Sequence, residues 1–296
     1  MKGKWFCYLL LLVCWACSEA EEKYPVYRVD FDHPDTVMPA DLFSKVEVIP
    51  LETNDKSRFS SGELGRKDDR YYILDRQQQL FFCFDTTGKF KYVLDNKPKN
   101  KEKKKHLSVR SILNPYSYYY QGKWYYYLTF RNIVYNKDAK GNQFIAYRWD
   151  FGKYNDDEET RLSFPPLPIQ VLAEIQKAWM KANSAFALTN ARQSDKYIYT
   201  LVERIAGDSI LPEGLQFYHL LCYKPEKRCY YFNAFADGIP LSTELRLENQ
   251  YILTMVSFAE KEKFLELDLL DEESRNILVQ LKETDNPVIL KWWFKK

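Results

Sequence analysis

Four segments of the chain repeat one pattern, in which a polar residue precedes a nearly unbroken run of aromatic and β-branched residues. They are Arg70–Asp75, Lys123–Thr129, Lys196–Val202 and Gln250–Val256. Unbroken apolar runs are typical of strands buried on both faces. The segments start 53, 73 and 54 residues apart, close to the length of one propeller blade except in the middle. Blades stacked around an axis cover both faces of each strand. The pattern therefore predicts an all-β chain folded as a β-propeller of four-stranded antiparallel blades.

Each of the first three segments is followed by a predicted β-hairpin, two strands that flank a short turn. The hairpins are Leu80–Asp85 with Phe90–Leu94, Asn132–Tyr135 with Phe144–Trp149, and Gln216–Tyr223 with Cys229–Asn233. The opening strand Lys45–Pro50 has no such partner nearby, and the last blade gains Pro287–Phe294 but stays one strand short. An unpaired edge promotes aggregation. We therefore expect these two ends of the domain to pair and to close the propeller.

Two segments interrupt the strand pattern. Residues 168–182 carry apolar side chains at helical spacing behind a proline suited to a first helical turn, which predicts a helical insertion in the long middle gap. Residues 271–282 predict a second, short helix with Asp271 as its N-cap. Ile277, Leu278 and Leu281 form the apolar side of that helix.

The first residues are typical of an export signal. Lys2 and Lys4 precede a short apolar run that ends at Ala16, and Cys17 follows at once. The run is far shorter than the ~20 residues that span a bilayer. This order resembles a bacterial lipobox, which predicts a signal peptide over residues 1–16 and lipid attachment at Cys17. An ordinary cleaved signal is the alternative.

The residues after Cys17 are acidic and would form a lipidated tether over 17–22, followed by a β-propeller domain over 23–296. They resemble the acidic tract that carries lipoproteins of Gram-negative gut anaerobes to the outer face of the outer membrane. The expected partner of the chain is therefore a membrane, reached through the lipid. Display on the cell surface is favoured, with an anchor that faces the periplasm as the alternative.

Charge and motifs exclude several function classes. The formal charge of +2 comes from Lys2 and Lys4, so the rest of the chain is neutral and gives no electrostatic reason to expect nucleic-acid binding. The basic run 97–106 is typical of a solvated loop. No metalloprotease, phosphate-loop or nucleophile-elbow motif is present, so no cofactor is expected. His219 and Cys222 lie three residues apart on a predicted strand and point to opposite faces, which argues against a shared metal.

Three cysteines follow Cys17, namely Cys83, Cys222 and Cys229. If the turn 224–227 closes a hairpin, Cys222 and Cys229 lie directly opposite each other, about 4.5–5.5 Å apart at their Cα atoms. That separation suits a disulfide, and an exported protein meets oxidising conditions. The alternative is a pair of buried free thiols. In either case Cys83 is expected to be a lone core thiol.

The chain also resembles the six-bladed β-propeller lipoproteins common in Gram-negative gut anaerobes. The matching residues are Phe43–Thr53, Tyr71–Asp75, Phe84–Lys89 and, after the short helix, Asn286–Leu290. The resemblance implies up to six blades, of which four repeats are visible. The family usually carries a glycine-rich loop after its first blade, whereas this chain has the lysine-rich stretch 95–105. The resemblance implies no catalytic residues.

Candidate ligand-binding residues are few. Propeller enzymes that cut glycans use acids on loops that line the central channel, and Asp75, Asp85, Asp150 and Glu203 end predicted strands. Acids in such places are also ordinary turn formers. Aromatic residues could stack on sugar rings. Most aromatic residues of the strands should lie in the core, which leaves Tyr116 and Tyr118, expected in a loop, as candidates for stacking on a sugar ring. The candidate ligand-binding residues are therefore Tyr116, Tyr118, Asp75 and Asp150.

Three function classes remain open. The first is a surface-anchored, non-catalytic propeller that binds a glycan, a peptide or a partner protein. The second is a glycan-cleaving hydrolase or lyase, which would need acids gathered at the mouth of the channel. The third is a subunit of an outer-membrane assembly, which would present a large exposed apolar patch.

Overall fold

The structure is a computed structural model that describes residues 23–59, 61–95, 116–127, 131–138, 140–155, 186–205 and 215–295. Several sequence predictions lie outside the described residues: the signal 1–16, Cys17 and its tether, the basic run 97–106, and the helical insertion 168–182. In the described part of the chain, no helix is long and apolar enough to cross a membrane.

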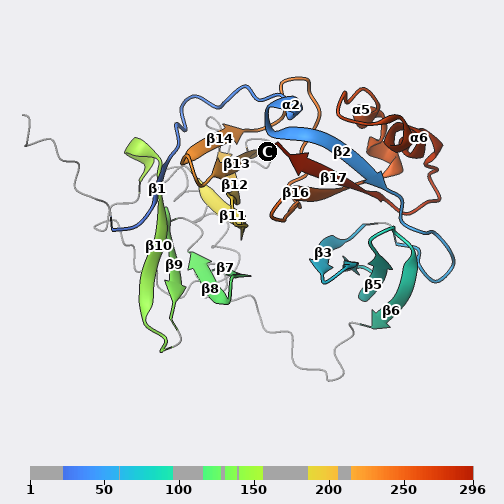
Figure 1. The fold of residues 1–296 in the computed structure, drawn as a ribbon, viewed down its shortest axis with the longest axis horizontal. Helices are drawn as coiled ribbons and strands as arrows, with labels where there is room; N and C mark the ends of the chain where they lie inside the picture. Colours follow the sequence, from blue (N-terminus) through green and yellow to red (C-terminus); the bar gives the residue numbers. More distant parts are fainter. Residues whose placement is uncertain are drawn as a thin grey trace, which may run out of the picture.

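The described strands form four sheets around a common centre, which we number as blades in chain order (Figure 1). Blade 1 holds β3 (Glu63–Lys67), β4 (Arg70–Asp75), β5 (Leu80–Asp85) and β6 (Phe90–Asp95). Blade 2 holds β7 (Tyr116–Tyr120), β8 (Lys123–Tyr127), β9 (Ile133–Lys137) and β10 (Gln143–Asp150), followed by the 3₁₀-helix η1 (Gly152–Tyr154). Blade 3 holds β11 (Ala187–Gln193), β12 (Tyr197–Ile205), β13 (Leu215–Tyr223) and β14 (Arg228–Phe232). Blade 4 holds β15 (Arg246–Leu247), β16 (Tyr251–Val256), β17 (Val288–Phe294) and β2 (Phe43–Ile49).

The predicted all-β propeller is thus confirmed, and each repeated segment is the second strand of its blade. One blade departs from the expected four strands. In blade 2 the short strand β1 (Val26–Arg28) pairs in parallel with β10, where Tyr27 lies opposite Trp149. The remaining pairs of that sheet are antiparallel. The N-terminal segment therefore crosses the outer edge of blade 2 before it reaches blade 4.

Three apolar clusters join the blades in order. Tyr118 and Tyr147 of blade 2 share a buried cluster with Ile198 and Leu220 of blade 3. A second cluster joins blade 3 to blade 4, and a third joins blade 4 to blade 1 through Ile73 and Leu253. In the described residues no such cluster joins blade 1 to blade 2. One face of each of these two blades therefore lacks a described neighbour.

This arrangement corrects the expectation that all four repeated strands are buried on both faces. Strands β12 and β16 are buried almost throughout, because a blade packs on each side of them. Strands β4 and β8 are instead only partly buried, with exposed or half-buried side chains on the face away from the neighbouring blade. Within the described residues, the second face of blades 1 and 2 therefore carries the exposed and half-buried side chains of these strands.

The ends of the domain pair as expected. Strand β17 is antiparallel to β2, with Leu290 opposite Val48 and Trp292 opposite Val46. Short helices cover this blade: α2 (Pro39–Leu42), η5 (Phe258–Glu260), α5 (Glu262–Leu265) and α6 (Glu272–Gln280). Helix α6 is the predicted one, and the Asp271 side chain caps it by accepting from the Ser274 backbone N–H. The Ser274 hydroxyl in turn accepts from the backbone N–H of Val48, 3.1 Å away.

A single buried amide fastens the last strand to the first blade. Asn286 is 1 % exposed, and its side chain accepts from the backbone N–H of Phe59 at 3.0 Å. It donates to the carbonyl oxygens of Glu52 and Ser57, both at 2.9 Å. The loop after β2, which holds Glu52 and Ser57, also contacts the β5–β6 turn of blade 1 at Gly88. A Cβ atom on Gly88 would lie 1.9 Å from the carbonyl oxygen of Pro50 in that loop. Gly88 also has φ = +82°, a backbone conformation that favours glycine. The lack of a side chain therefore allows both this conformation and the close contact with Pro50.

Asn286→Ala should destabilise the domain by about 2–4 kcal/mol, because it leaves the Phe59 N–H and two carbonyl oxygens buried without partners. Chemical denaturation followed by tryptophan fluorescence measures this loss. The control is Asn233→Ala, at an exposed position in the loop after β14, which should change stability by less than about 0.5 kcal/mol. Equal effects of the two substitutions would show that the amide does not hold the blades together.

Candidate functional site

The face of blade 2 that lacks a described neighbour is rich in aromatic residues. Tyr119 lies directly opposite Trp124, and Tyr126 lies opposite Tyr135. Side chains alternate between the two faces of a strand, so these four residues share one face. The other face carries Tyr118, Tyr127, Val134 and Tyr147, which are buried against blade 3. The uncovered face is therefore a continuous strip of rings that the blade interface does not use.

Part of this strip forms a hollow of about 760 Å³, which we call the aromatic hollow. It is lined by Ser117, Gly122, Lys123, Trp124, Tyr126, Lys137 and Asp138. Trp124 is 57 % exposed, and the ring of Tyr119, 61 % exposed, lies 5.3 Å from it between centroids. Monomeric proteins seldom expose adjacent large rings without a use for them. The hollow has the size and the mixed lining typical of small-molecule sites.

Tyr126 forms the floor of the aromatic hollow. Its ring stacks on Tyr135 at 5.8 Å, and the Lys137 ammonium lies 5.3 Å from the ring centroid. The Tyr126 hydroxyl is buried and has no hydrogen-bond partner within the described chain. Burial, and then the neighbouring Tyr135, raise the pKa of this hydroxyl, so it stays protonated at neutral pH.

A tight turn sets the edge of the hollow. Gln121 and Gly122 join β7 to β8 with φ angles of 45° and 75°, the positive values of a type I′ hairpin turn. The Gln121 amide donates to Asp195 of blade 3 at 2.8 Å, and the Tyr120 hydroxyl donates to the same carboxylate at 2.6 Å. These bonds hold the hairpin against blade 3. The rings of Trp124 and Tyr119 are consequently presented by a fixed backbone.

The structure corrects the assignment of Tyr116 and Tyr118 to a loop. Both residues lie on β7, opposite Tyr127 and Tyr125. Tyr118 is only 6 % exposed, and its hydroxyl bonds to Tyr147 and to Gln193 of blade 3. It belongs to the core between blades and offers no ring to a ligand. The side chain of Tyr116 lies outside the described residues.

Asp75 and Asp85 are turn formers. Asp75 is fully buried and accepts from the backbone N–H groups of Gln77 and Gln78. Asp85 accepts from Thr87 and Lys89, and Lys91 lies 2.6 Å from its second oxygen. The Lys91 and Thr87 contacts lower the pKa of Asp85. Asp75 pairs with Leu80 and Asp85 with Arg70, so the two acids lie at opposite ends of the β4–β5 ladder.

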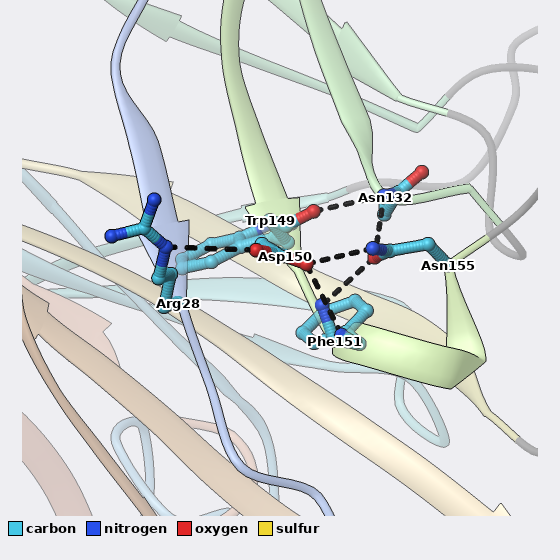
Figure 2. A network of polar contacts seen from close by, with 7 residues as sticks. Arg28, Asn132, Trp149, Asp150, Phe151 and Asn155 are labelled. Carbon is cyan, nitrogen blue, oxygen red and sulfur yellow. Dashed lines mark hydrogen bonds and ion pairs between the residues drawn. The ribbon is translucent and has the colours of Figure 1, made fainter. Parts of the chain in front are cut away.

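Asp150 ends β10 and anchors the strands around it (Figure 2). Its carboxylate accepts from Asn155 at 2.7 Å and from the Gly152 N–H at 3.1 Å, and Arg28 of β1 lies 3.7 Å away. The Asn155 oxygen accepts from the Phe151 N–H and from Asn132. The Asn155 hydrogen bond is the main cause of a lowered pKa at Asp150. This acid stays ionised and is engaged in fixing β1 and η1.

The four candidate acids lie in three different blades. Glu203 lies on β12 of blade 3, where burial raises its pKa and the Thr189 hydroxyl donates to it at 3.1 Å. Asp75 and Asp85 lie in blade 1 and Asp150 lies in blade 2. Each of the four has hydrogen-bond partners of its own.

His219 and the cysteines are also structural. His219 is buried, and its Nδ1 lies 3.0 Å from the hydroxyl of Tyr199. Cys222 lies opposite Cys229 and is bonded to it, with Cα atoms 4.0 Å apart, slightly closer than expected. Cys83 is a buried free thiol. Among the described residues, no group of three or more histidine, cysteine, aspartate or glutamate side chains could hold a metal ion.

Sequence reasoning missed Trp124 and Tyr119. Both lie in or next to a repeated strand whose apolar run predicted a core position on both faces. The signal that could have found them is the strand alternation after the Gln121-Gly122 turn, which separates Tyr119 and Trp124 from the buried Tyr118 and Tyr127. Which side of the strand lacks a neighbour among the described residues cannot be read from the strand itself.

Comparison with known proteins supports the fold. Residues 17–99 match a family described as a 6-bladed beta-propeller. Among curated proteins, none matches the sequence. A crystal structure of a Bacteroides fragilis protein described as exported has a TM-score of 0.57 at 11 % identity, covering 93 % of this chain and all of that chain. It is similar in fold alone.

Two further structures are much less similar. A protein from Bacteroides vulgatus has a TM-score of 0.33 at 8 % identity, with 85 % of this chain and 98 % of that chain covered. Virginiamycin B lyase from Staphylococcus aureus has a TM-score of 0.21 at 10 % identity, with 71 % and 66 % covered. Both similarities are too weak to carry an argument about function.

His219 makes the stability of the domain depend on pH. Burial lowers its pKa from 6.5 to about 4, although a backbone contact to Leu241 acts in the opposite direction. At His219 the unfolded chain binds a proton below about pH 6.5 and the folded chain only below about pH 4. The contribution of His219 to stability therefore falls from pH 6.5 to pH 4, by up to about 3 kcal/mol, and then levels. His219→Gln should flatten this part of the profile, measured as the difference in unfolding free energy between pH 7 and pH 4.5.

His33 provides the control for this experiment. It is exposed, and its hydrogen bond to Asp30 raises its pKa, so it acts in the opposite direction. His33→Gln should leave the loss of stability between pH 6.5 and 4 in place. An unchanged profile in His219→Gln would contradict the assigned cause.

Proposed function

We propose that this propeller is a non-catalytic binding protein that holds a glycan in the aromatic hollow of blade 2. The observation that carries the proposal is the exposed pair Trp124 and Tyr119 beside a hollow of about 760 Å³. The C–H face of a pyranose ring packs on such rings. Polar groups of Ser117, Lys123 and Asp138 line the same hollow and can bond to hydroxyl groups of the sugar.

The geometry favours a small ligand over a protein partner. Stable protein interfaces bury about 800 Å² on each side and carry a broad apolar centre. Here the exposed rings are bordered by lysine and aspartate side chains within one hollow, and the hollow lies in the range of about 300–1,000 Å³ common for small-molecule sites. The polar side chains that line the hollow can bond to the hydroxyl groups of a sugar, whereas an apolar peptide side chain leaves them without partners.

Binding without catalysis is supported by the state of three of the four candidate acids, Asp75, Asp85 and Asp150. The pKa values of Asp85 and Asp150 are lowered by their own hydrogen-bond partners, so neither is suited to be a general acid near neutral pH. Asp75 is buried within a turn. These carboxylates accept hydrogen bonds from the backbone and from neighbouring side chains, and these bonds hold turns and strand ends in place.

Trp124→Ala should weaken glycan binding at least about tenfold, equivalent to about 1.4 kcal/mol, because it removes the stacking surface. Binding is measured by screening a glycan panel and then by calorimetry on the best ligand. The matched control is Phe144→Ala, which removes a ring that is 52 % exposed in the same sheet. Phe144 lies opposite Asn136, on the other face of the sheet from Trp124 and Tyr126, so this substitution should leave binding unchanged.

Four results would contradict the proposal or a part of it. Wild-type protein that binds no glycan of the panel contradicts it, and so does equal binding by Trp124→Ala. Binding of a protein partner that Trp124→Ala abolishes, without any glycan binding, would assign the hollow to a protein interface instead. Cleavage of a bound glycan would contradict the non-catalytic part.

We further propose that the protein is a lipoprotein of the outer membrane, attached through Cys17 and displayed on the cell surface. The support is the N-terminal sequence, in which a short apolar run ends at Ala16 and is followed by Cys17 and an acidic segment. The fold similarity to a Bacteroides protein described as exported is consistent with this location. A binding face on a tethered domain would then meet glycans outside the cell.

Cys17→Ala should release the protein from the membrane fraction. Each methylene of an acyl chain contributes about 0.8 kcal/mol of membrane binding, and several chains together give stable attachment. Fractionation followed by high-salt washing measures the release, and Cys7→Ala, a cysteine substitution earlier in the apolar run, is the matched control that leaves the acylated residue in place. Retention of Cys17→Ala in the washed membranes would show that the anchor lies elsewhere.

A further inference from the structure

The first strands of blades 1, 3 and 4 bring arginine residues together. Strand β15 contacts both β11 and β3, and Figure 1 shows β3 and β11 at the middle of the arc. These strands carry Arg66, Arg192 and Arg246. The Asn190 side chain of β11 donates to the carbonyl oxygen of Thr243 at 2.7 Å, which ties β11 to the segment before β15.

Two of the three arginines share one carboxylate. Glu248 lies 3.7 Å from Arg66 and 3.4 Å from Arg246. Asp69 is a second partner of Arg66 at 3.5 Å, but its side chain is 93 % exposed. The Nε atom of Arg66 is buried and has no hydrogen-bond partner within the described chain. Glu248 therefore neutralises only part of the positive charge.

Arg192 has no ion-pair partner in the described part of the chain. One of its terminal nitrogens donates to the carbonyl oxygen of Ala191 at 2.8 Å, and its Nε is buried without a partner. Burial lowers its pKa, and the charge of Arg246 lowers it further. Glu63 acts in the opposite direction, but that carboxylate is paired with Arg76. A half-buried cation beside a second cation is unfavourable unless an anion compensates for it.

We infer that Arg192 and Arg246 form a binding site for an oxyanion of a ligand, either a carboxylate or a sulfate or phosphate group. A guanidinium presents its N–H donors in a planar fork that matches the two oxygens of such a group. Arg246 is 38 % exposed, so an anion can reach the pair from solvent. Glu248 orients Arg246 and Arg66 while leaving Arg192 to the ligand. This site lies on blades 3 and 4 and does not depend on the aromatic hollow.

The test is the thermal stability of the purified mature protein in sodium sulfate, phosphate, glucuronate or chloride at equal ionic strength. A ligand that binds only the folded state raises the melting temperature in a saturable way. We expect such a rise over chloride with at least one oxyanion. Glucuronate acting alone identifies a carboxylate site, and sulfate or phosphate acting alone identifies a site for those groups.

Arg192→Gln should reduce the anion-dependent rise at least threefold, and Arg246→Gln provides a second variant should the first fail to fold. The control Arg228→Gln changes an exposed arginine of β14 that stacks on Tyr230 and should keep the full rise. No saturable rise in the wild-type protein overturns the inference. An undiminished rise in folded Arg192→Gln or Arg246→Gln also overturns it.

Discussion

The fold depends on the bonds that Asn286 makes between the last strand and the start of blade 1. Its side-chain amide satisfies backbone groups of Glu52, Ser57 and Phe59, which lie more than 220 residues earlier in the chain. Antiparallel pairing of β17 with β2 continues the same junction. Blade 4 is thus built from both ends of the domain. The segments Phe43–Thr53 and Asn286–Leu290 meet at this junction.

The packing between blades leaves one face of blade 1 and one face of blade 2 without a described neighbour. Three interfaces bury the aromatic and aliphatic faces of neighbouring blades, whereas the second faces of blades 1 and 2 have no described neighbour. On blade 2 that face carries Trp124, Tyr119 and the floor residue Tyr126. On strand β8, Tyr127 is therefore buried in the core, whereas Trp124 on the opposite face is exposed to solvent. Core and candidate site are two faces of one sheet, so the site is as rigid as the blade.

Charged groups divide into two kinds in this structure. Asp75, Asp85 and Asp150 each have several hydrogen-bond donors from nearby turns, and these bonds hold strand ends in place. Arg192 instead lies half-buried beside Arg246 without a described counter-ion. Carboxylates that already accept several hydrogen bonds are poorly suited to proton transfer, whereas a guanidinium without a counter-ion can bind an oxyanion.

The sequence by itself determined the four repeated strands, the hairpins after the first three of them, the helix at 271–282 and the pairing of the two ends. These follow from local apolar patterns, turn residues and the need to remove an unpaired edge. Tertiary structure alone decided which strand faces stay open, because a run such as Lys123–Thr129 has the same composition whether one neighbour covers it or two. It also decided that Tyr118 is core and Trp124 is exposed, and that Asp75 is buried. Those outcomes depend on contacts between residues far apart in the chain, which a local pattern does not encode.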